Sequence, residues 1–410
     1  MLKKRLLVIL ILLAGITLVL TMTGCGGSGA GGGGGGGTIT NLPALTGTVS
    51  ITGTAKVGET LTANTDALGG SGAITYQWRR GTANTGTDSN TYVIQTADIG
   101  STITVRVSRS GYSGSVTSEP TAAVTGETNG NGEVKITIPG STVELTMVKI
   151  EGGTFRMGSP DTEPDRWTNE NPRTANSGNV TISGFYMGKY PVTQAQYEAV
   201  MGNNPSAFTG DNRPVERVTW FDAIEFCNKL SELQGLTPVY TITDRTPTSG
   251  HPITSATVTA NWSATGYRLP TEAQWEYACR AETTTAFNWG TNQITSDQAN
   301  FRANSSPYND SPLGISREET TDVGTFSANA FGLYDKHGNV WEWCWDWYTA
   351  SYDDAGGYNN PTGPDSGADR VIRGGSWSDY GQILRSAFRF RSYPSYRDDF
   401  LGFRLARPGN

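Results

Sequence analysis

The segments Arg370-Val-Ile-Arg-Gly-Gly-Ser-Trp377 and Gly402-Phe-Arg-Leu-Ala406 frame the part of the chain that decides its fold. Val371 and Ile372 are β-branched and lead into a Gly-Gly turn, which predicts that a strand ends there. The second segment alternates apolar and charged residues, as a half-buried strand does. We therefore expect two β-strands to frame the residues between them.

The residues between the two strands, 378–401, are rich in aromatic side chains set among Ser, Asp and Arg. About a quarter of these positions are aromatic, against 10% of the whole chain, and they follow neither a period of 2 nor one of 3.6. Rigid rings beside short polar side chains give recognition surfaces contact area at low entropic cost. The pattern predicts a ligand-binding surface, and an irregular loop with inward-packed aromatics is the alternative. The predicted ligand-binding residues are Ser378, Asp379, Tyr380, Gly381, Ile383, Leu384, Phe388, Phe390, Ser392, Tyr393, Ser395, Tyr396, Asp398, Asp399 and Phe400.

The N-terminus has the pattern of an export signal. Basic residues are followed by an apolar run from Leu6 to Leu20, which is short for a membrane-spanning helix, and then by Gly24-Cys25. This segment resembles a bacterial lipoprotein signal, with Met22 where a leucine is usual. The resemblance implies removal of residues 1–24, lipidation of Cys25 and attachment to the outer membrane or cell surface.

The composition argues against nucleic-acid binding and against histidine-based chemistry. Removing residues 1–24, which contain three basic and no acidic residues, takes the net charge from −7 to −10, and the chain has no basic patch. The chain has only two histidines, His251 and His337, which leaves little for zinc binding or histidine catalysis. An odd number of cysteines remains after the first, which permits at most one disulfide bond. They are Cys227, Cys279 and Cys344.

Shifts in composition divide the chain into several parts. Residues 25–38 are almost pure glycine and are predicted to be a flexible tether. Residues 39–126 are rich in Thr, Val and Ile with regular turn signals, which predicts a small β-sandwich with Trp78 in its core. This part resembles bacterial immunoglobulin-like modules and is expected to act as a spacer. A linker, 127–133, precedes a larger domain over 134–410.

Three helices are predicted in the larger domain, each headed by a threonine. Thr193 opens a helix through Met201 with the spacing of a capping box, Thr219 heads a second that ends at Gly235, and Thr271 heads a third. Short strands and long loops make up the rest, which predicts an α+β fold with much irregular structure. Three acidic residues on or near these helices are assigned to solvated faces. They are Glu225, Glu272 and Glu276.

A turn with oxygen ligands precedes a strand of alternating tryptophans. The indoles at alternate positions of 341–347 are expected to form part of the core. Ahead of them, Asp335, the carbonyl of Gly338 and Glu342 lie within eight residues around a tight turn. Hard oxygen ligands at such spacing suit Ca²⁺ better than a transition metal.

Six motifs over residues 143–408 occur in the order seen in formylglycine-generating-enzyme-like (sulfatase-modifying-factor) domains, which this part resembles. The resemblance implies an elaborated C-type-lectin-like α+β fold. It also implies a structural calcium site, and a second site for which the acidic partner is a weak match. The motifs are Gly152–Gly158, Lys189–Thr193, Pro214–Trp220, Tyr267–Glu272, Gly338–Trp343 and Arg373–Trp377 with Gly402–Arg404. The implied ligands are Asp335, Gly338, Val340 and Glu342 for the first site, and Asn300, Phe301 and Asp310 for the second.

The chain departs from this family at the catalytic positions. The active oxidase has two cysteines five residues apart, just beyond the Gly-Gly-Ser-aromatic turn. Asp379 and Leu384 occupy those positions here, and no cysteine follows Cys344. Without a thiolate there is neither a copper ligand nor a redox nucleophile. We therefore expect no copper and no sulfatase-modifying activity.

The frame over about 371–406 resembles the variable proteins of diversity-generating retroelements, of the Treponema variable protein type. Randomising the adenines of Asn codons in those systems yields Phe, Tyr, Ser, Asp, Gly, Ile or Leu, but never Trp, Lys, Glu, Met or Gln. Residues 378–401 contain none of the first four excluded types and a single Gln382, which would be a fixed position. Arg385, Arg389 and Arg397 are expected to brace the loop.

The resemblance implies a surface receptor for a macromolecular ligand. A protein ligand is slightly favoured over carbohydrate because broad aromatic patches suit protein epitopes. The alternatives are a structural or assembly lipoprotein, and an enzyme of unknown activity on the same fold.

Overall fold

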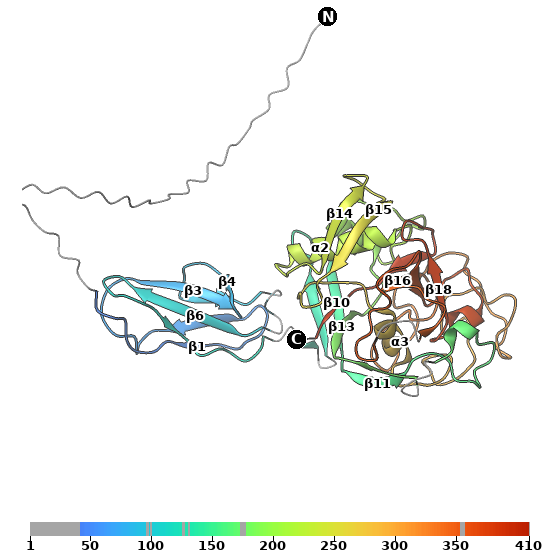
Figure 1. Cartoon of the computed structure of the whole chain (residues 1–410), viewed down its shortest axis with the longest axis horizontal. Coiled ribbons are helices and arrows are strands. Elements are labelled where there is room, and N and C mark those ends of the chain that lie inside the picture. The colour runs from blue at the N-terminus through green and yellow to red at the C-terminus, as the bar shows by residue number, and fades with distance from the viewer. Residues whose placement is uncertain are drawn as a thin grey trace, which may run out of the picture. The chain divides into compact units, whose positions relative to one another are not determined.

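The computed structural model describes residues 42–95, 98, 101–124, 128–129, 132–172, 178–352 and 357–409 (Figure 1). The predicted signal peptide, the lipidation site Cys25 and the predicted tether lie outside these ranges. The predicted boundaries of the domains stay predictions. Within the described ranges, no helix combines the length and the apolar composition that a bilayer-crossing segment requires.

The described residues between 42 and 124 fold into two small antiparallel sheets around a core of their own. Trp78 is fully buried, and its ring stacks on that of Tyr92, which belongs to the other sheet, with 5.5 Å between the ring centroids. The predicted core position of this tryptophan is therefore confirmed. One sheet contains β1 (Ser50–Thr52), β2 (Thr60–Asn64) and β5 (Thr91–Val93). The other contains β4 (Ala83–Thr85), β3 (Ile74–Arg80), β6 (Ile103–Arg109) and β7 (Val116–Thr117).

The larger domain is built on a five-stranded and a four-stranded sheet with two added hairpins. The five-stranded sheet runs in the order β20 (Ala406–Pro408), β13 (Phe185–Gly188), β10 (Glu144–Ile150), β9 (Glu133–Thr137) and β8 (Thr128–Asn129). The four-stranded sheet runs in the order β18 (Arg389–Ser392), β17 (Arg370–Arg373), β16 (Trp341–Trp347) and β19 (Leu401–Phe403). The hairpins are β11 (Gly153–Arg156) with β12 (Asn179–Ile182), and β14 (Tyr240–Thr246) with β15 (Ser255–Ala260).

The two predicted framing strands lie on opposite sides of the tryptophan strand. β17 pairs with β16 in antiparallel fashion, and β19 pairs with it in parallel. The predicted second strand is in fact two, because the chain leaves the four-stranded sheet after β19 and joins the five-stranded sheet as β20. The prediction of a half-buried strand here was wrong, since all of 401–407 is buried.

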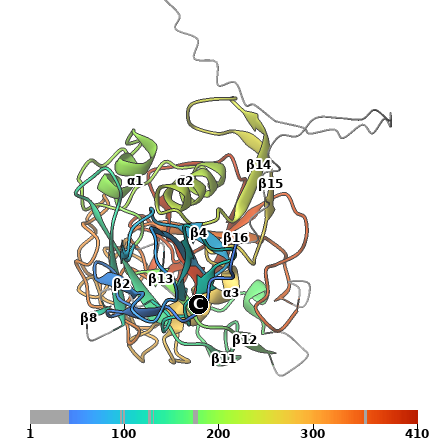
Figure 2. The same cartoon turned by 90° about the vertical axis from the view of Figure 1, so that its left-hand side faces the viewer.

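The three predicted helices are confirmed as α1 (Gln194–Met201), α2 (Trp220–Leu233) and α3 (Glu272–Arg280). Each begins after a threonine whose side chain accepts from the backbone three residues on, in a reciprocal capping box. Helices α1 and α2 lie beside each other (Figure 2), and the rings of Tyr197 and Phe226 stack between them at 5.6 Å.

Two expectations about side-chain environment need correction. Glu272 and Glu276 of α3 are buried rather than solvated, because buried arginines pair with both of them. In β16, Trp341 and Trp343 are buried as predicted, whereas Trp345 and Trp347 are only half-buried. A regular alternation fixes which face a side chain is on, but not how completely that face is covered.

Candidate functional site

The predicted ligand-binding segment leaves β17 through a turn whose left-handed backbone and close packing favour glycine. Gly374 and Gly375 have φ values of 99° and 70°. A Cβ atom on Gly375 would lie 2.7 Å from a methyl carbon of Leu384. The absence of a side chain at Gly375 therefore allows the following 3₁₀ helix, Gly381–Leu384, to pack closely against this turn. From there the chain returns along β18 and reaches β19.

Three aromatic side chains of this segment are open to solvent. Phe390, Tyr393 and Tyr396 are 46%, 66% and 38% exposed, and Ser395 is also exposed. Large aromatic side chains seldom stand this exposed together without a function. Eight further predicted positions are half-buried, so part of each residue remains accessible to a ligand. They are Ser378, Asp379, Tyr380, Ile383, Ser392, Asp398, Asp399 and Phe400.

Three predicted contact residues lie inside the protein instead. Leu384 is fully buried, and Phe388 is 1% exposed, with its ring 5.0 Å from that of Trp167. Gly381 is buried, and a Cβ atom there would lie 2.8 Å from the side chain of Ile294. These residues support the surface and do not form part of it, so the prediction that they contact ligand was wrong.

Asp379 has an internal role. One of its carboxylate oxygens accepts from the backbone and hydroxyl of Ser376, at 3.0 and 2.6 Å, and from the indole of Trp341 at 2.9 Å. Burial raises the pKa of this carboxyl group, and these donors oppose that shift. Asp379 therefore ties the start of the segment to the tryptophan strand.

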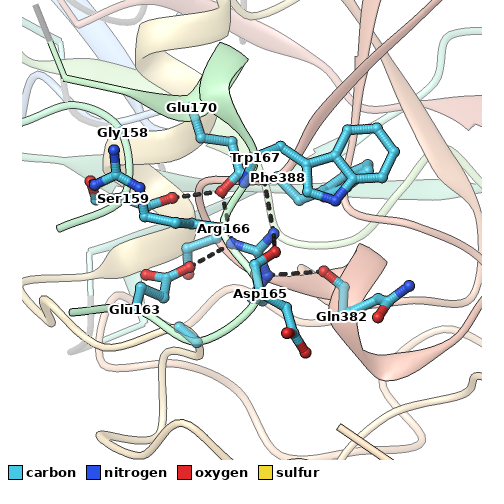
Figure 3. A network of polar contacts seen from close by, with 12 residues as sticks. Gly158, Ser159, Glu163, Asp165, Arg166, Trp167, Glu170, Gln382 and Phe388 are labelled. Carbon is cyan, nitrogen blue, oxygen red and sulfur yellow. Dashed lines mark hydrogen bonds and ion pairs between the residues drawn. The ribbon is translucent and has the colours of Figure 1, made fainter. Parts of the chain in front are cut away.

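Arg385 holds the middle of the segment against residues 163–170. Figure 3 shows its partners Glu163, Glu170 and Gln382 in this network. Its guanidinium group is fully buried and donates to Glu163 at 2.6 Å and to both carboxylate oxygens of Glu170 at 2.6 and 2.7 Å. It also donates to the carbonyl oxygens of Asp165 and Gln382. The predicted bracing role of this arginine is confirmed.

A second cluster of buried ion pairs holds the return strand. Arg389 donates to both carboxylate oxygens of Glu272, at 2.8 and 2.6 Å. Arg373 bridges Glu272 and Glu276, and it also donates to the carbonyl oxygens of Ser386 and Phe388. Because these groups are removed from water, each arginine is fixed in one orientation. Arg397, by contrast, is exposed.

Sequence reasoning missed that other segments extend this surface. The side chain of Trp167, which packs on Phe388, is 43% exposed. An open groove of about 530 Å³ lies next to the start of the segment, and Arg302, Ser316 and Ser378 all line it. Beside Ser316, Leu313 and Ile315 are 60% and 64% exposed. No periodicity marks these residues, so only the tertiary contacts could have identified them.

The four residues that the resemblance assigns to the first calcium site do not fit a metal ion in this protein. Both carboxylate oxygens of Glu342 already accept hydrogen bonds, from Arg404, Trp275 and the ammonium group of Lys336. Asp335 does keep one buried carboxylate oxygen without a hydrogen-bond partner, as a cation ligand would, but Glu342 supplies no second free oxygen. Among the described residues, no group of three His, Cys, Asp or Glu side chains is arranged to hold a metal.

The second implied site fits in part. The side-chain oxygen of Asn300 is buried and has no hydrogen-bond partner, as expected of a ligand atom for a cation. The next residue, Phe301, is buried too. Asp310 is exposed and no contact connects it with Asn300, so it does not complete the site.

The three cysteines within the described ranges are buried free thiols. Burial raises the pKa of Cys279 to about 11, and the pKa of the other two is raised further. None of them is poised to act as a thiolate.

The antiparallel five-stranded sheet, the mixed four-stranded sheet, the sparse helices and the loop held by ion pairs define a C-type-lectin-like α+β domain. Residues 139–408 match the sulfatase-modifying factor enzyme 1-like domain, and this match covers about two thirds of the chain. The chain therefore belongs to this family.

The similar proteins carry names that describe different functions. Chaperone protein LppX of Paenibacillus barcinonensis is 38% identical over 248 residues, which cover 58% of this chain and 80% of that protein. The formylglycine-generating enzyme of Mus musculus is 33% identical over 294 residues, covering 63% and 74%. Among solved structures, Treponema denticola variable protein 1 matches with a TM-score of 0.55 and 31% identity, covering 67% of this chain and 99% of that one.

Proposed function

We propose that this protein is an exported lipoprotein receptor whose lectin-fold domain binds a macromolecular ligand through the exposed part of residues 378–400. The observation that carries the proposal is the exposure of Phe390, Tyr393 and Tyr396 on a segment that buried ion pairs hold rigid. A rigid scaffold with exposed aromatics binds without first ordering its contact residues.

The distribution of exposed hydrophobic side chains supports this surface. Eight large hydrophobic side chains are exposed in the described part of residues 132–409. Six of them lie in the predicted segment, contact it, or precede the groove residue Ser316 by no more than three positions in the sequence. They are Trp167, Leu313, Ile315, Phe390, Tyr393 and Tyr396. Such a gathering favours a protein ligand over a carbohydrate.

Export and membrane attachment through Cys25 rest on the N-terminal sequence, and the structural likeness to a variable protein agrees with a receptor role. We infer that the protein is not an oxidase of the formylglycine type, because Asp379 and Leu384 occupy the positions of its two cysteines. Any structural Ca²⁺ would be held at Asn300 and the carbonyl of Phe301. We expect neither copper nor nucleic acid as partners.

The test is a binding experiment with the full chain and a displayed library of protein fragments. After selection, the dissociation constant of an enriched fragment is measured for the wild type and for the triple variant Phe390→Ala, Tyr393→Ala, Tyr396→Ala. We expect at least about a 100-fold loss of affinity, since a few aromatic anchors dominate interfaces. The melting temperature should stay nearly unchanged because these side chains are exposed.

The matched control is the double variant Leu233→Ala, Trp262→Ala, which truncates the other two exposed side chains of the domain. It should leave binding intact. Unchanged affinity in the triple variant, or a collapse of its fold, would contradict the proposed surface.

The similarity to a protein named as a chaperone favours one second candidate, a role in assembly without a variable ligand. In that case the activity would not depend on the three exposed aromatics, so the same triple variant separates the two functions.

A further inference from the structure

A lysine ammonium group lies inside the turn that resembles a calcium site. Lys336 is 2% exposed, and its Nζ is 3.3 Å from a carboxylate oxygen of Glu342. The same Nζ lies 3.8 Å from the ring centroid of Trp275. The ammonium group is thus held between a carboxylate and the face of an indole, both of which attract a cation.

Glu342 has no oxygen left for a metal. Its Oε1 accepts from the Nε and Nη2 of Arg404 at 3.0 and 2.7 Å. Its Oε2 accepts from the indole of Trp275 at 2.6 Å as well as from Lys336. Glu342 is therefore a carboxylate with two cationic partners.

The formal charges of the turn already cancel. The two carboxylates, Asp335 and Glu342, are matched by Lys336 and Arg404, and all four side chains are buried. Arg404 pairs with Glu342 and also donates to the backbone carbonyl of Asp335. A divalent ion added here would leave two positive charges uncompensated in the protein interior. Burying uncompensated charge away from water is strongly unfavourable.

We propose that the ammonium group of Lys336 takes the place of the calcium ion at this turn, so that residues 335–342 keep their conformation without a divalent metal. The lysine thus serves as an internal counter-ion. Gly338, whose Cβ would lie 2.2 Å from the carbonyl oxygen of Asn300, lets the turn close directly on the neighbouring segment.

The test counts bound Ca²⁺ per chain by equilibrium dialysis after treatment with a chelator. Three full-length proteins are compared: wild type, Asp335→Ala and Lys336→Met. We expect the wild type and Asp335→Ala to bind the same number of ions, whatever Asn300 contributes. Lys336→Met should bind one ion more, because it leaves a negative charge uncompensated, and Ca²⁺ should raise its melting temperature.

Lys229→Met is the matched control, because it too removes a lysine that pairs with a carboxylate, Glu225 at 3.4 Å, but on helix α2 and outside this turn. It should not change the number of bound ions. Lys336→Gln replaces the methionine variant, and Asp335→Ser the alanine variant, if either fails to fold. The proposal is overturned if the folded Asp335 variant binds fewer ions than the wild type, or if folded Lys336 variants bind no more.

Discussion

Single buried arginines decide whether the candidate surface keeps its shape. Arg385 has two carboxylate partners in Glu163 and Glu170. Arg385→Met should lower the free energy of unfolding by about 3–5 kcal/mol, because two acids would remain buried without a counter-charge. Urea denaturation measures this. The control is Arg391→Met in β18, further along the same segment, whose arginine is 55% exposed and pairs with Asp369 at 3.4 Å. Its loss should be under about 1 kcal/mol, and equal losses in both variants would refute the distinction.

A second residue-scale effect concerns a buried acid beneath the surface. Glu216 is fully buried, with one carboxylate oxygen bonded to the backbone of Ala207 and Phe208 and the other without a partner. Burial raises its pKa to about 7, and the charge of Asp399 adds to the shift.

The raised pKa means that the folded protein binds a proton at Glu216 more tightly than the unfolded chain does. The stability that this proton contributes is fully present below the usual pKa of 4.5, and it is lost as the pH rises to about 7. Glu216→Gln should therefore gain stability relative to the wild type, by about 2 kcal/mol, between pH 5 and pH 8. Urea denaturation at the two pH values measures the difference. A constant difference between the two proteins would show that this group does not titrate as described.

At the scale of elements, the four-stranded sheet depends on the close approach of Gly402 to the backbone of Val215. A Cβ atom on Gly402 of β19 would lie 2.3 Å from the carbonyl oxygen of Val215, so only glycine lets β19 lie beside β16. Gly402→Ala should cost about 1–3 kcal/mol of stability through overpacking. Gly357→Ala is the control, because none of the residues that the structure describes, apart from its neighbours in the chain, lies within 4 Å of its Cβ position. Thermal melting compares them, and an unchanged Gly402 variant would mean that the strand can shift freely.

At the scale of the whole molecule, ion pairs inside the larger domain replace much of the regular secondary structure. Arg373, Arg385, Arg389 and Arg404 are all fully buried, and each pairs with carboxylates more than 60 residues away in sequence. The fold joins segments 159–170, 272–276 and 335–342 to its last forty residues through these contacts. A long loop can therefore be displayed rigidly although only a few of its residues are in strands.

The sequence by itself determined the three helices, because their capping boxes are local, and the family motifs determined the class of fold. It also identified a loop with exposed aromatics. Tertiary structure alone decided that Leu384 and Phe388 face inward, that Glu272 and Glu276 are buried, and that Lys336 occupies the turn. The physical reason is that the burial of a side chain, and the sign of its electrostatic environment, depend on groups brought together from distant parts of the chain, which local patterns do not encode.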